Sequence, residues 1–450
     1  MSNLSNNYIA GDWVKGASSI SNINPSNTND VIGEFAQASN SQLEDALNSA
    51  QVAQRQWAAT GLEQRQAVLM KIGEEMMARS AELGELLSRE EGKPVAEGKG
   101  EVYRAGQFFT YYAAEVLRQG GDTADSVRPN IEIDVRREPM GTVAIISPWN
   151  FPTATASWKI APALAFGNAV IWKPANLTPA SAVALTEIIS KQDIPKGLFN
   201  LVMGSGSSIG QSLAESPKVH AISFTGSYDV GRQIAGAAAK NLTKFQLELG
   251  SKNPLVVMDD ADMDVAVAAA TGGAFGSTGQ KCTASSRLVV HASIHDEFVE
   301  RMSQSTSALK VGDALQEGTQ IGPAASQQQL DSNLKYMALA KEEGCETCLF
   351  LGDWNHHRAS INIHTLQHGL RALERLNDAF EKVYFIPGNH DLYYRDRRDV
   401  HSVEWANHLP NVVIVNDWFN EGNVVIAPWL VGDDYKKLAK MKGKYLFAHL

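Results

Sequence analysis

Apolar residues recur every three or four positions in two stretches near the start of the chain. Within residues 41–60 they include Leu43, Leu47 and Ala50, and the same spacing continues through residues 63–91. This is the period of a helix that buries one face, so the pattern predicts amphipathic helices in both stretches.

Short apolar runs replace this pattern between residues 142 and 260. They read TVAIIS, AVIWKP, LFNLVM, HAISFTG and NPLVVM, and most are separated by segments compatible with helices. Alternating strands and helices predict a parallel sheet built from βαβ units. Ligands of such sheets bind beyond the carboxyl ends of the strands, so the residues after each run are the first candidates for function.

The amino-acid composition changes near residue 346. Eight of the eleven histidines and four of the nine tryptophans lie in this last part of the chain. The shift predicts a second module over residues 346–450. No Pro, Gly or Ser-rich linker precedes it, although natural domain boundaries usually fall in such a linker.

Size, charge and cysteine content narrow the class of protein. A chain of 450 residues is long enough for more than one core, and no apolar run is long enough to cross a bilayer. The net charge of -10 argues against nonspecific binding to nucleic acid. Three cysteines and a start without a secretory pattern predict a cytoplasmic enzyme with a small-molecule substrate.

Polar residues follow three of the predicted strands. Asn150 comes after TVAIIS, Lys173 lies in AVIWKP, and Gly226 ends HAISFTG, with Ser227 following it at a predicted helix start. Free amides and the positive end of a helix dipole at Ser227 suit a diphosphate. A capped helix after a tight turn is the alternative interpretation of that segment.

Five strings together resemble one family. They are PWNFP, WKPANLTP, FTGSYDVG, LELGSKNP and FGSTGQKCTASSR. In this order and spacing they are similar to the aldehyde dehydrogenase superfamily over residues 8–340, with a texture closest to bacterial semialdehyde dehydrogenases of the 2-oxoglutarate semialdehyde type. The resemblance implies a Rossmann-like NAD(P)-binding domain with N-terminal helices over residues 1–255 and a partial α/β catalytic domain over residues 256–345.

The resemblance also assigns catalytic roles. Cys282 would attack the aldehyde as a thiolate, and Asn150 with the Cys282 backbone amide would hold the oxyanion. Glu248, in a partly buried position, would take a proton from the water that hydrolyses the thioester. Lys159 resembles the family's proton-relay lysine, and a structural lysine is the alternative.

Cofactor residues follow in the same way. Lys173 resembles the lysine that binds the adenosine ribose, and Asn176 stands where the family often has a glutamate that selects NAD. Without that carboxylate a 2′-phosphate is not repelled, so we expect NADP to be accepted beside NAD. Trp149, Leu249 and the pair Gly226 and Ser227 complete the predicted cofactor site.

The family pattern fades after residue 340, and the segments that usually follow in the family are not found. These segments include the strand that assembles oligomers, so a homo-oligomer is implied by the resemblance while its strand is missing. The exposed sheet edges expected here would impair activity and solubility.

The histidine-rich module resembles a second family. LFLGDWNHHR, VYFIPGNHD and FAHL look like the calcineurin-like metallophosphoesterases, most closely phage-type members. The resemblance implies that Asp353 bridges two metals, Asn389 and His449 bind the second one, and His390 acts on the phosphate. The ions would be manganese, iron or zinc, held weakly because the first and last ligand motifs are not found.

Three functional hypotheses remain open. The chain is an aldehyde oxidoreductase with an added fragment, a metal-dependent phosphoesterase with a dehydrogenase-like scaffold, or a joining of two gene fragments without efficient activity. The first retains its nucleophile, base, oxyanion donor and most of its cofactor residues, so we favour it.

Overall fold

The fold is taken from a computed structural model, which forms two compact units. Residues 1–290 and 297–329 make up the first, and residues 291–296 and 330–450 the second. The residues that the structure describes are 4–118, 120–342, 347–350, 373–374, 377, 382–387, 404–421, 424–428, 430, 434–438 and 445–448. Each unit is described by itself.

A seven-stranded sheet forms the centre of the first unit, in the order β12-β11-β8-β9-β10-β2-β3. Its strands are β2 (Asn7–Ile9), β3 (Asp12–Val14), β8 (Thr142–Ile146), β9 (Ala169–Lys173), β10 (Phe199–Leu201), β11 (Ala221–Gly226) and β12 (Lys244–Leu249). The five strands from β12 to β10 are parallel, and β2 pairs with β10 in the antiparallel sense. The chain order reverses between β8 and β11, which is where a doubly wound sheet opens a crevice for its ligand.

Helices cover this sheet. They are α1 (Asn40–Ala58), α2 (Leu62–Ala78), α3 (Ser80–Glu91), α4 (Val95–Glu115), η1 (Val116–Arg118), α5 (Ala154–Ala165), α6 (Pro179–Ser190), the π-helical turn η2 (Gly206–Gly210), α7 (Gln211–Glu215) and α8 (Tyr228–Lys240). The predicted helix over residues 41–60 is α1, which begins at a capping box formed by Ser39 and Gln42. The stretch 63–91 forms two helices, because the backbone leaves the helical conformation at Arg79.

The alternation predicted for residues 142–260 is confirmed except at its last strand. The run NPLVVM forms β13 (Pro254–Val257), which pairs with β14 (Arg287–Val290) outside the central sheet. The fifth parallel strand is β12 instead, whose residues alternate between polar and apolar types. An edge strand with one solvated face needs no continuous apolar run, and for that reason β12 was not predicted.

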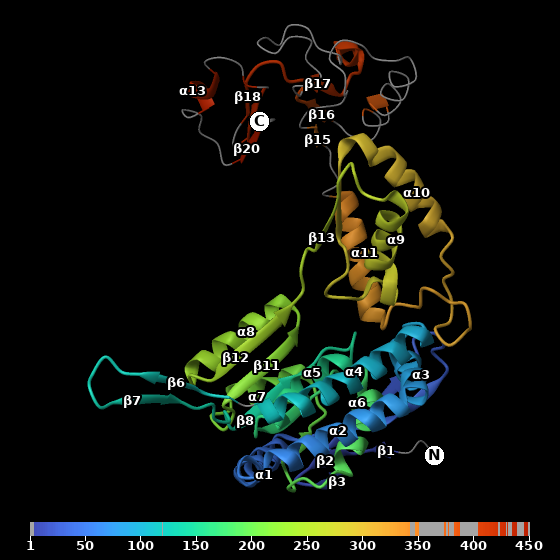
Figure 1. Ribbon diagram of the computed structural model, residues 1–450. Coiled ribbons are helices and arrows are strands. Elements are labelled where there is room, and N and C mark those ends of the chain that lie inside the picture. Colours follow the sequence, from blue (N-terminus) through green and yellow to red (C-terminus); the bar gives the residue numbers. More distant parts are fainter. Residues whose placement is uncertain are drawn as a thin grey trace. The chain divides into compact units, whose positions relative to one another are not determined.

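The core of this unit lies between the sheet and its helices. Trp57, Trp172 and Phe109 are fully buried there, and α4 packs on α2, α3 and α5. A small sheet holds β1 (Leu4–Ser5), β4 (Ser18–Ile23) and β5 (Val31–Gln37). The hairpin of β6 (Asp122–Asp125) and β7 (Glu132–Val135) extends away from the central sheet (Figure 1). Beyond β12 the unit also contains α9 (Met263–Phe275), η3 (Gly276–Gly279) and most of α10 (His295–Ser307), whereas η4 (Ala292–Ile294) belongs to the second unit.

The second unit contains two small sheets. One is parallel, with β15 (Thr347–Phe350), β16 (Lys382–Phe385) and β17 (Val412–Ile414); the other holds β18 (Phe419–Glu421), β19 (Val424–Ala427) and β20 (Tyr445–Ala448). Short helices η5 (Glu404–His408) and α13 (Asp434–Leu438) accompany them, and α11 (Gln327–Glu342) begins in the first unit. Alternate side chains of β16 enter two apolar clusters, with Val383 and Phe385 in one and Tyr384 in the other.

The predicted α/β class is confirmed, whereas the predicted limits at residues 255 and 345 stay predictions. In the described part of the chain, no helix combines the length and apolarity needed to cross a membrane. Localisation in the cytoplasm also remains a prediction.

Candidate active site

The loop after β8 and the start of α8 lie at the reversal point of the central sheet. Ser147 opens the loop, and its hydroxyl accepts a hydrogen bond of 2.9 Å from the indole of Trp172 in β9. Trp149 and Asn150 follow and are half-buried. On the neighbouring strand, Ser227 caps α8 by accepting the amide of Val230. The edge predicted to bind the ligand therefore carries the predicted residues.

Gly226 ends β11 where a side chain would not fit. A Cβ atom at this position would lie 2.5 Å from the ring of Phe224. Gly231, in the first turn of α8, is restricted in the same way by Leu249, which would lie 2.6 Å from an added Cβ. The backbone can therefore approach a ligand closely at the start of α8.

Asn150 contacts the loop that carries Cys282. Its Nδ2 atom donates to the carbonyl of Gln280 at 2.9 Å, two residues before the cysteine. Cys282 itself is an exposed free thiol. Asn253 holds the same loop from the other side, since its Nδ2 atom donates to the carbonyls of Cys282 at 2.7 Å and Ala284 at 3.1 Å. The structure thus brings the predicted nucleophile loop and the predicted oxyanion donor together.

The turn before Cys282 has an unusual backbone. Ser277 and Thr278 adopt positive φ values of 50° and 59°, in the left-handed region that side chains rarely occupy. Glu97 accepts hydrogen bonds from the amide and the hydroxyl of Ser277. The hydroxyl of Thr278 accepts the amide of Gly322 at 3.1 Å. These contacts hold a conformation that costs of order 1–3 kcal/mol per residue when unsupported.

Lys159 and Glu248 belong to one polar chain. Lys159, buried in α5, donates to Ser223 Oγ at 2.8 Å and to Gln246 Oε1 at 3.2 Å. Gln246 then donates through Nε2 to Glu248 Oε1 at 2.7 Å. Burial lowers the pKa of Lys159 to about 8, and the charge of Glu248 acts in the opposite direction. A lysine with this pKa can exchange protons near neutral pH.

The expectation that Glu248 is partly buried is wrong. Its side chain is exposed, because β12 is the edge strand of the central sheet and Glu248 lies on its open face. One carboxylate oxygen accepts a hydrogen bond from Gln246, and the other has no hydrogen-bond partner among the described residues.

The residues predicted for the cofactor fit a nucleotide. Lys173 is buried, and its Nζ atom donates a hydrogen bond of 3.0 Å to the carbonyl of Pro174. Burial lowers the pKa of Lys173 to about 8. A ligand phosphate or ribose would restore polar partners to this side chain. The buried hydroxyl of Thr225 has no partner among the described residues, and Asn176 bonds to Gln37 at 3.2 Å. Ser227 and Gly226 stand at the same edge.

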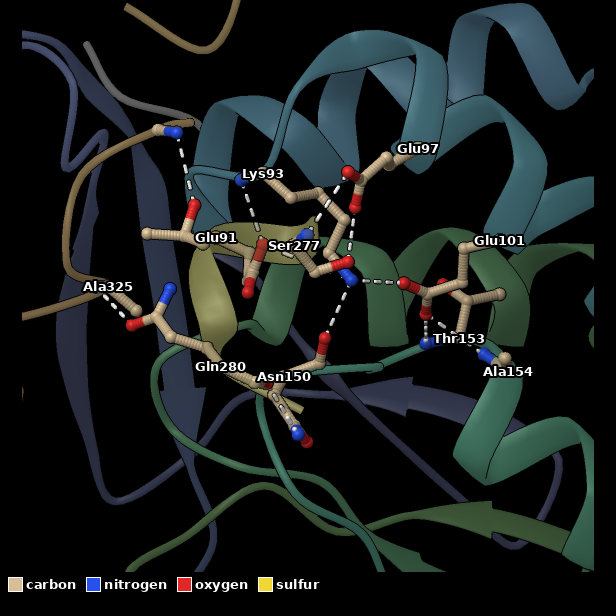
Figure 2. Close-up of polar contacts among 12 residues, drawn as sticks. Glu91, Lys93, Glu97, Glu101, Asn150, Thr153, Ala154, Ser277, Gln280 and Ala325 are labelled. Atoms are coloured by element: carbon tan, nitrogen blue, oxygen red, sulfur yellow. Dashed lines mark hydrogen bonds and ion pairs between the residues drawn. The ribbon is translucent and has the colours of Figure 1, made fainter. Parts of the chain in front are cut away.

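Several residues of the site were not identified from the sequence. Lys93, two residues before α4, and Glu97 and Glu101 in its first two turns contact both loops (Figure 2). Gln246 and Asn253 are the others. A signal existed for the first group, since Glu97 and Glu101 are four residues apart and so share one helix face.

No metal centre is found in the part of the chain that the structure describes. No group of three or more His, Cys, Asp or Glu side chains is arranged there to hold an ion. The predicted ligands Asp353, Asn389 and His449, and the predicted catalytic His390, lie outside the described residues.

Residues 13–360 match the profile of the aldehyde dehydrogenase family. The chain belongs to this family. It is 41% identical over 340 residues to the alpha-ketoglutaric semialdehyde dehydrogenase of Bacillus subtilis (strain 168), a match that covers 75% of this chain and 70% of the relative. It is 37% identical over 338 residues to the succinate-semialdehyde dehydrogenase [NADP(+)] GabD of Escherichia coli (strain K12), again over 75% and 70% of the two chains.

Solved structures of this family share the fold. The succinate-semialdehyde dehydrogenase of Burkholderia pseudomallei superposes with a TM-score of 0.74 and 33% identity, over 76% of this chain and 71% of the other. PnpE, solved in complex with nicotinamide adenine dinucleotide, gives a TM-score of 0.73 and 35% identity over 76% and 70%. The prediction of an NAD(P)-dependent aldehyde dehydrogenase is thereby confirmed.

A second profile, that of the calcineurin-like phosphoesterases, matches residues 295–448. It confirms the resemblance of the histidine-rich part to that family. The two matches overlap over residues 295–360, so the second begins well before the predicted module limit at residue 346.

Proposed function

We propose that this aldehyde dehydrogenase oxidises a semialdehyde to the carboxylate with NAD(P)⁺, through a covalent intermediate on Cys282. The observation that carries the proposal is the hydrogen bond from Asn150 to Gln280, because it joins an amide donor to the cysteine loop at the ligand edge of the sheet. Semialdehyde dehydrogenases among the relatives support the substrate class.

Attack by the Cys282 thiolate on the aldehyde carbon forms a C–S bond and places negative charge on the former carbonyl oxygen. Asn150 uses one amide hydrogen on Gln280, so its second hydrogen is available to that oxygen. A donor fixed in advance is worth about 10²–10³ in rate. Asn253 holds the backbone from Cys282 to Ala284 in place.

Lys173, Gly226 and Ser227 would hold the cofactor, and when bound it accepts the hydride that leaves the tetrahedral carbon. The carbon is thereby oxidised to a thioester on Cys282. Asn176 is uncharged, so a 2′-phosphate of NADP would meet no carboxylate from this residue, and Lys173 would be available to hold it.

Hydrolysis completes the cycle. The free oxygen of Glu248 takes a proton from water, and the resulting hydroxide displaces the thiolate from the acyl carbon. The carboxylate product leaves, and Cys282 is again a thiolate. Gln246 orients the Glu248 carboxylate, and Lys159 is positioned to exchange the proton with solvent as the pH rises towards 8.

Formation of NAD(P)H tests the proposal. Absorbance at 340 nm is followed with 2-oxoglutarate, succinate and glutarate semialdehydes, and with butanal, an aldehyde that has no carboxylate. Activity is expected with the semialdehydes and is expected to vanish in Cys282→Ala and Cys282→Ser. Retained activity in either variant, or no NAD(P)H with any of the aldehydes, contradicts the proposal.

A second activity, hydrolysis of a phosphodiester, is favoured by the calcineurin-like match and by the parallel pairing of β15, β16 and β17. Manganese-dependent hydrolysis of bis(p-nitrophenyl) phosphate tests it. We expect Asp353→Ala to abolish this hydrolysis and Cys282→Ala to leave it unchanged. Hydrolysis that survives Asp353→Ala contradicts this assignment.

A further inference from the structure

We infer that Lys93, Glu97 and Glu101 are positioning residues that fix the Asn150 loop and the Cys282 loop against the start of α4. The inference rests on the proposed function, because it concerns the alignment of the same nucleophile and oxyanion donor. None of the three side chains touches a reacting atom, so their role is exerted through the two loops.

Lys93 contacts the Asn150 loop directly. Its side chain is fully buried, and Nζ donates to the carbonyl of Asn150 at 2.6 Å and to Glu101 Oε2 at 2.7 Å (Figure 2). The ammonium also lies 3.9 Å from the ring centroid of Phe151. Burial alone would lower the pKa of Lys93, but the charges of Glu101 and Glu91 outweigh it and raise the pKa. The side chain is therefore a permanent cation on the backbone of the proposed oxyanion donor.

Glu101 holds the other end of the same loop. While Oε2 pairs with Lys93, Oε1 accepts the amides of Thr153 at 3.0 Å and Ala154 at 3.1 Å, at the start of α5. Free amides at a helix start attract a carboxylate. The four residues from Asn150 to Thr153 are thus fixed at both ends by one buried ion pair.

Glu97 holds the loop that carries Cys282 through two hydrogen bonds to Ser277. It lies one helical turn before Glu101, and its carboxylate accepts the amide of Ser277 at 3.1 Å together with the Ser277 hydroxyl. Ser277 begins the left-handed turn that leads to Cys282. Because residues four apart on a helix are about 5–6 Å from each other, α4 sets the spacing between the two loops.

Stability alone is a weak reason for such an arrangement. Replacing a buried ion pair with apolar residues of similar volume is often neutral or even stabilising. A cation and a carboxylate are required, however, to bind a carbonyl and two amides at the same time. We therefore expect their loss to change catalytic alignment more than folding.

Two reactions of the Cys282 thiolate separate alignment from folding. Acylation by p-nitrophenyl acetate passes through an oxyanion and needs the Asn150 donor, but it needs no cofactor. Alkylation by iodoacetamide is a direct displacement and forms no oxyanion. The ratio of the two rates therefore reports on the donor, whereas the alkylation rate reports on the thiolate.

The variant of choice is Lys93→Met combined with Glu101→Gln, because it removes both charges of the ion pair that joins Lys93 to Glu101. We expect the acylation rate in the full chain to fall about 10–100-fold, part of the loss caused by removing an oxyanion donor, with the alkylation rate within twofold of wild type. Glu97→Ala is expected to slow acylation by a similar factor. An unchanged ratio in the double variant overturns the inference, and unchanged acylation in Glu97→Ala overturns its Glu97 part.

Arg65→Met is the matched control. Arg65 is also a buried cation on backbone carbonyls, those of Ala58 and Ala165, but it contacts neither loop. Arg65→Met should lower the thermal midpoint without changing the ratio of the acylation rate to the alkylation rate. An equal fall of this ratio in Arg65→Met contradicts a specific role of Lys93.

Cys282→Ala and Asn150→Ala distinguish a failure of the positioning role from a failure of the proposed function. If Cys282→Ala is still acylated, the proposed function fails; if Asn150→Ala slows acylation and the double variant does not, only the positioning role fails.

Discussion

The Nζ atom of Lys159 and the Oε1 atom of Gln246 lie 3.2 Å apart, and the Nε2 atom of Gln246 donates a hydrogen bond to Glu248. A lysine from a buried helix is in this way connected to a carboxylate on the exposed edge of the sheet. The connection places a group with a pKa of about 8 within one residue of the proposed base.

The pH dependence of turnover tests this connection. Below pH 8 Lys159 is mostly charged, and above pH 8 it is mostly neutral and can accept a proton. We expect kcat to rise with pH through about 8 in the wild-type protein. Lys159→Arg, which stays charged, should lose this limb and reduce kcat by about 10²–10⁴, the usual contribution of a positioned proton-transfer group. Lys240→Arg, on the exposed end of α8, is the control. An unchanged limb in Lys159→Arg would show that another group titrates.

Cofactor choice is expected to depend on Asn176. Asn176→Glu introduces a carboxylate three residues after Lys173, where we expect it to repel the 2′-phosphate of NADP and to bind the ribose hydroxyls of NAD. The KM for NADP should rise at least tenfold relative to that for NAD, with little change in kcat. Asn176→Gln, which adds length without charge, should leave the ratio near that of the wild type. Equal effects of the two substitutions would contradict an electrostatic cause.

Loop geometry around the nucleophile is expected to depend on Asn253. Asn253→Asp keeps the size of the side chain and loses the amide that donates to the carbonyls of Cys282 and Ala284. A misplacement of about 1 Å costs as much as 10²-fold in rate. We predict that kcat/KM for the aldehyde falls about 10–100-fold while the dissociation constant of the cofactor, measured by fluorescence, changes less than threefold. Wild-type kcat/KM in this variant would mean that the loop is held by other contacts.

The free energy of unfolding is expected to depend on pH because of Glu90. This carboxyl is buried at the start of α6, where it accepts the amides of Ala180 and Ser181, and burial raises its pKa to about 8. Between pH 4.5 and 8 the folded state therefore keeps a proton that the unfolded state has lost. The stabilising contribution is complete below the unfolded pKa and declines as the pH rises through 8.

Urea unfolding of wild type and Glu90→Gln at pH 5.5, 7 and 8.5 measures this effect. The stability of the wild type relative to Glu90→Gln should decrease steadily over the series, because glutamine does not titrate. A difference that is constant with pH, or that grows, contradicts the burial effect.

Sequence patterns predicted the parts of the fold that depend on local repetition. Leu43, Leu47 and Ala50 share one buried face of α1, so their spacing predicts a helix. The apolar run before Asn150 is buried on both faces, so it predicts the strand β8. A motif predicts the role of Glu248, but no apolar run predicts its strand, because β12 lies at the edge of the sheet and alternates between polar and apolar residues.

The positioning contacts could not be predicted from the sequence. Lys93 and Asn150 are 57 residues apart, and Asn253 and Cys282 are 29 apart. Which polar side chain meets which carbonyl depends on how α4, β8 and the cysteine loop pack, and no local pattern encodes that packing. The metal ligands predicted around Asp353 stay predictions because they lie outside the described residues.

The covalent intermediate on Cys282 is the central claim, and trapping it is the most direct test. Glu248→Gln should form the thioester and hydrolyse it slowly, so a semialdehyde with NADP should give one equivalent of NADPH and an acyl group on the peptide that contains Cys282, seen by mass spectrometry. Absence of that adduct, together with turnover that survives Cys282→Ala, would contradict the account.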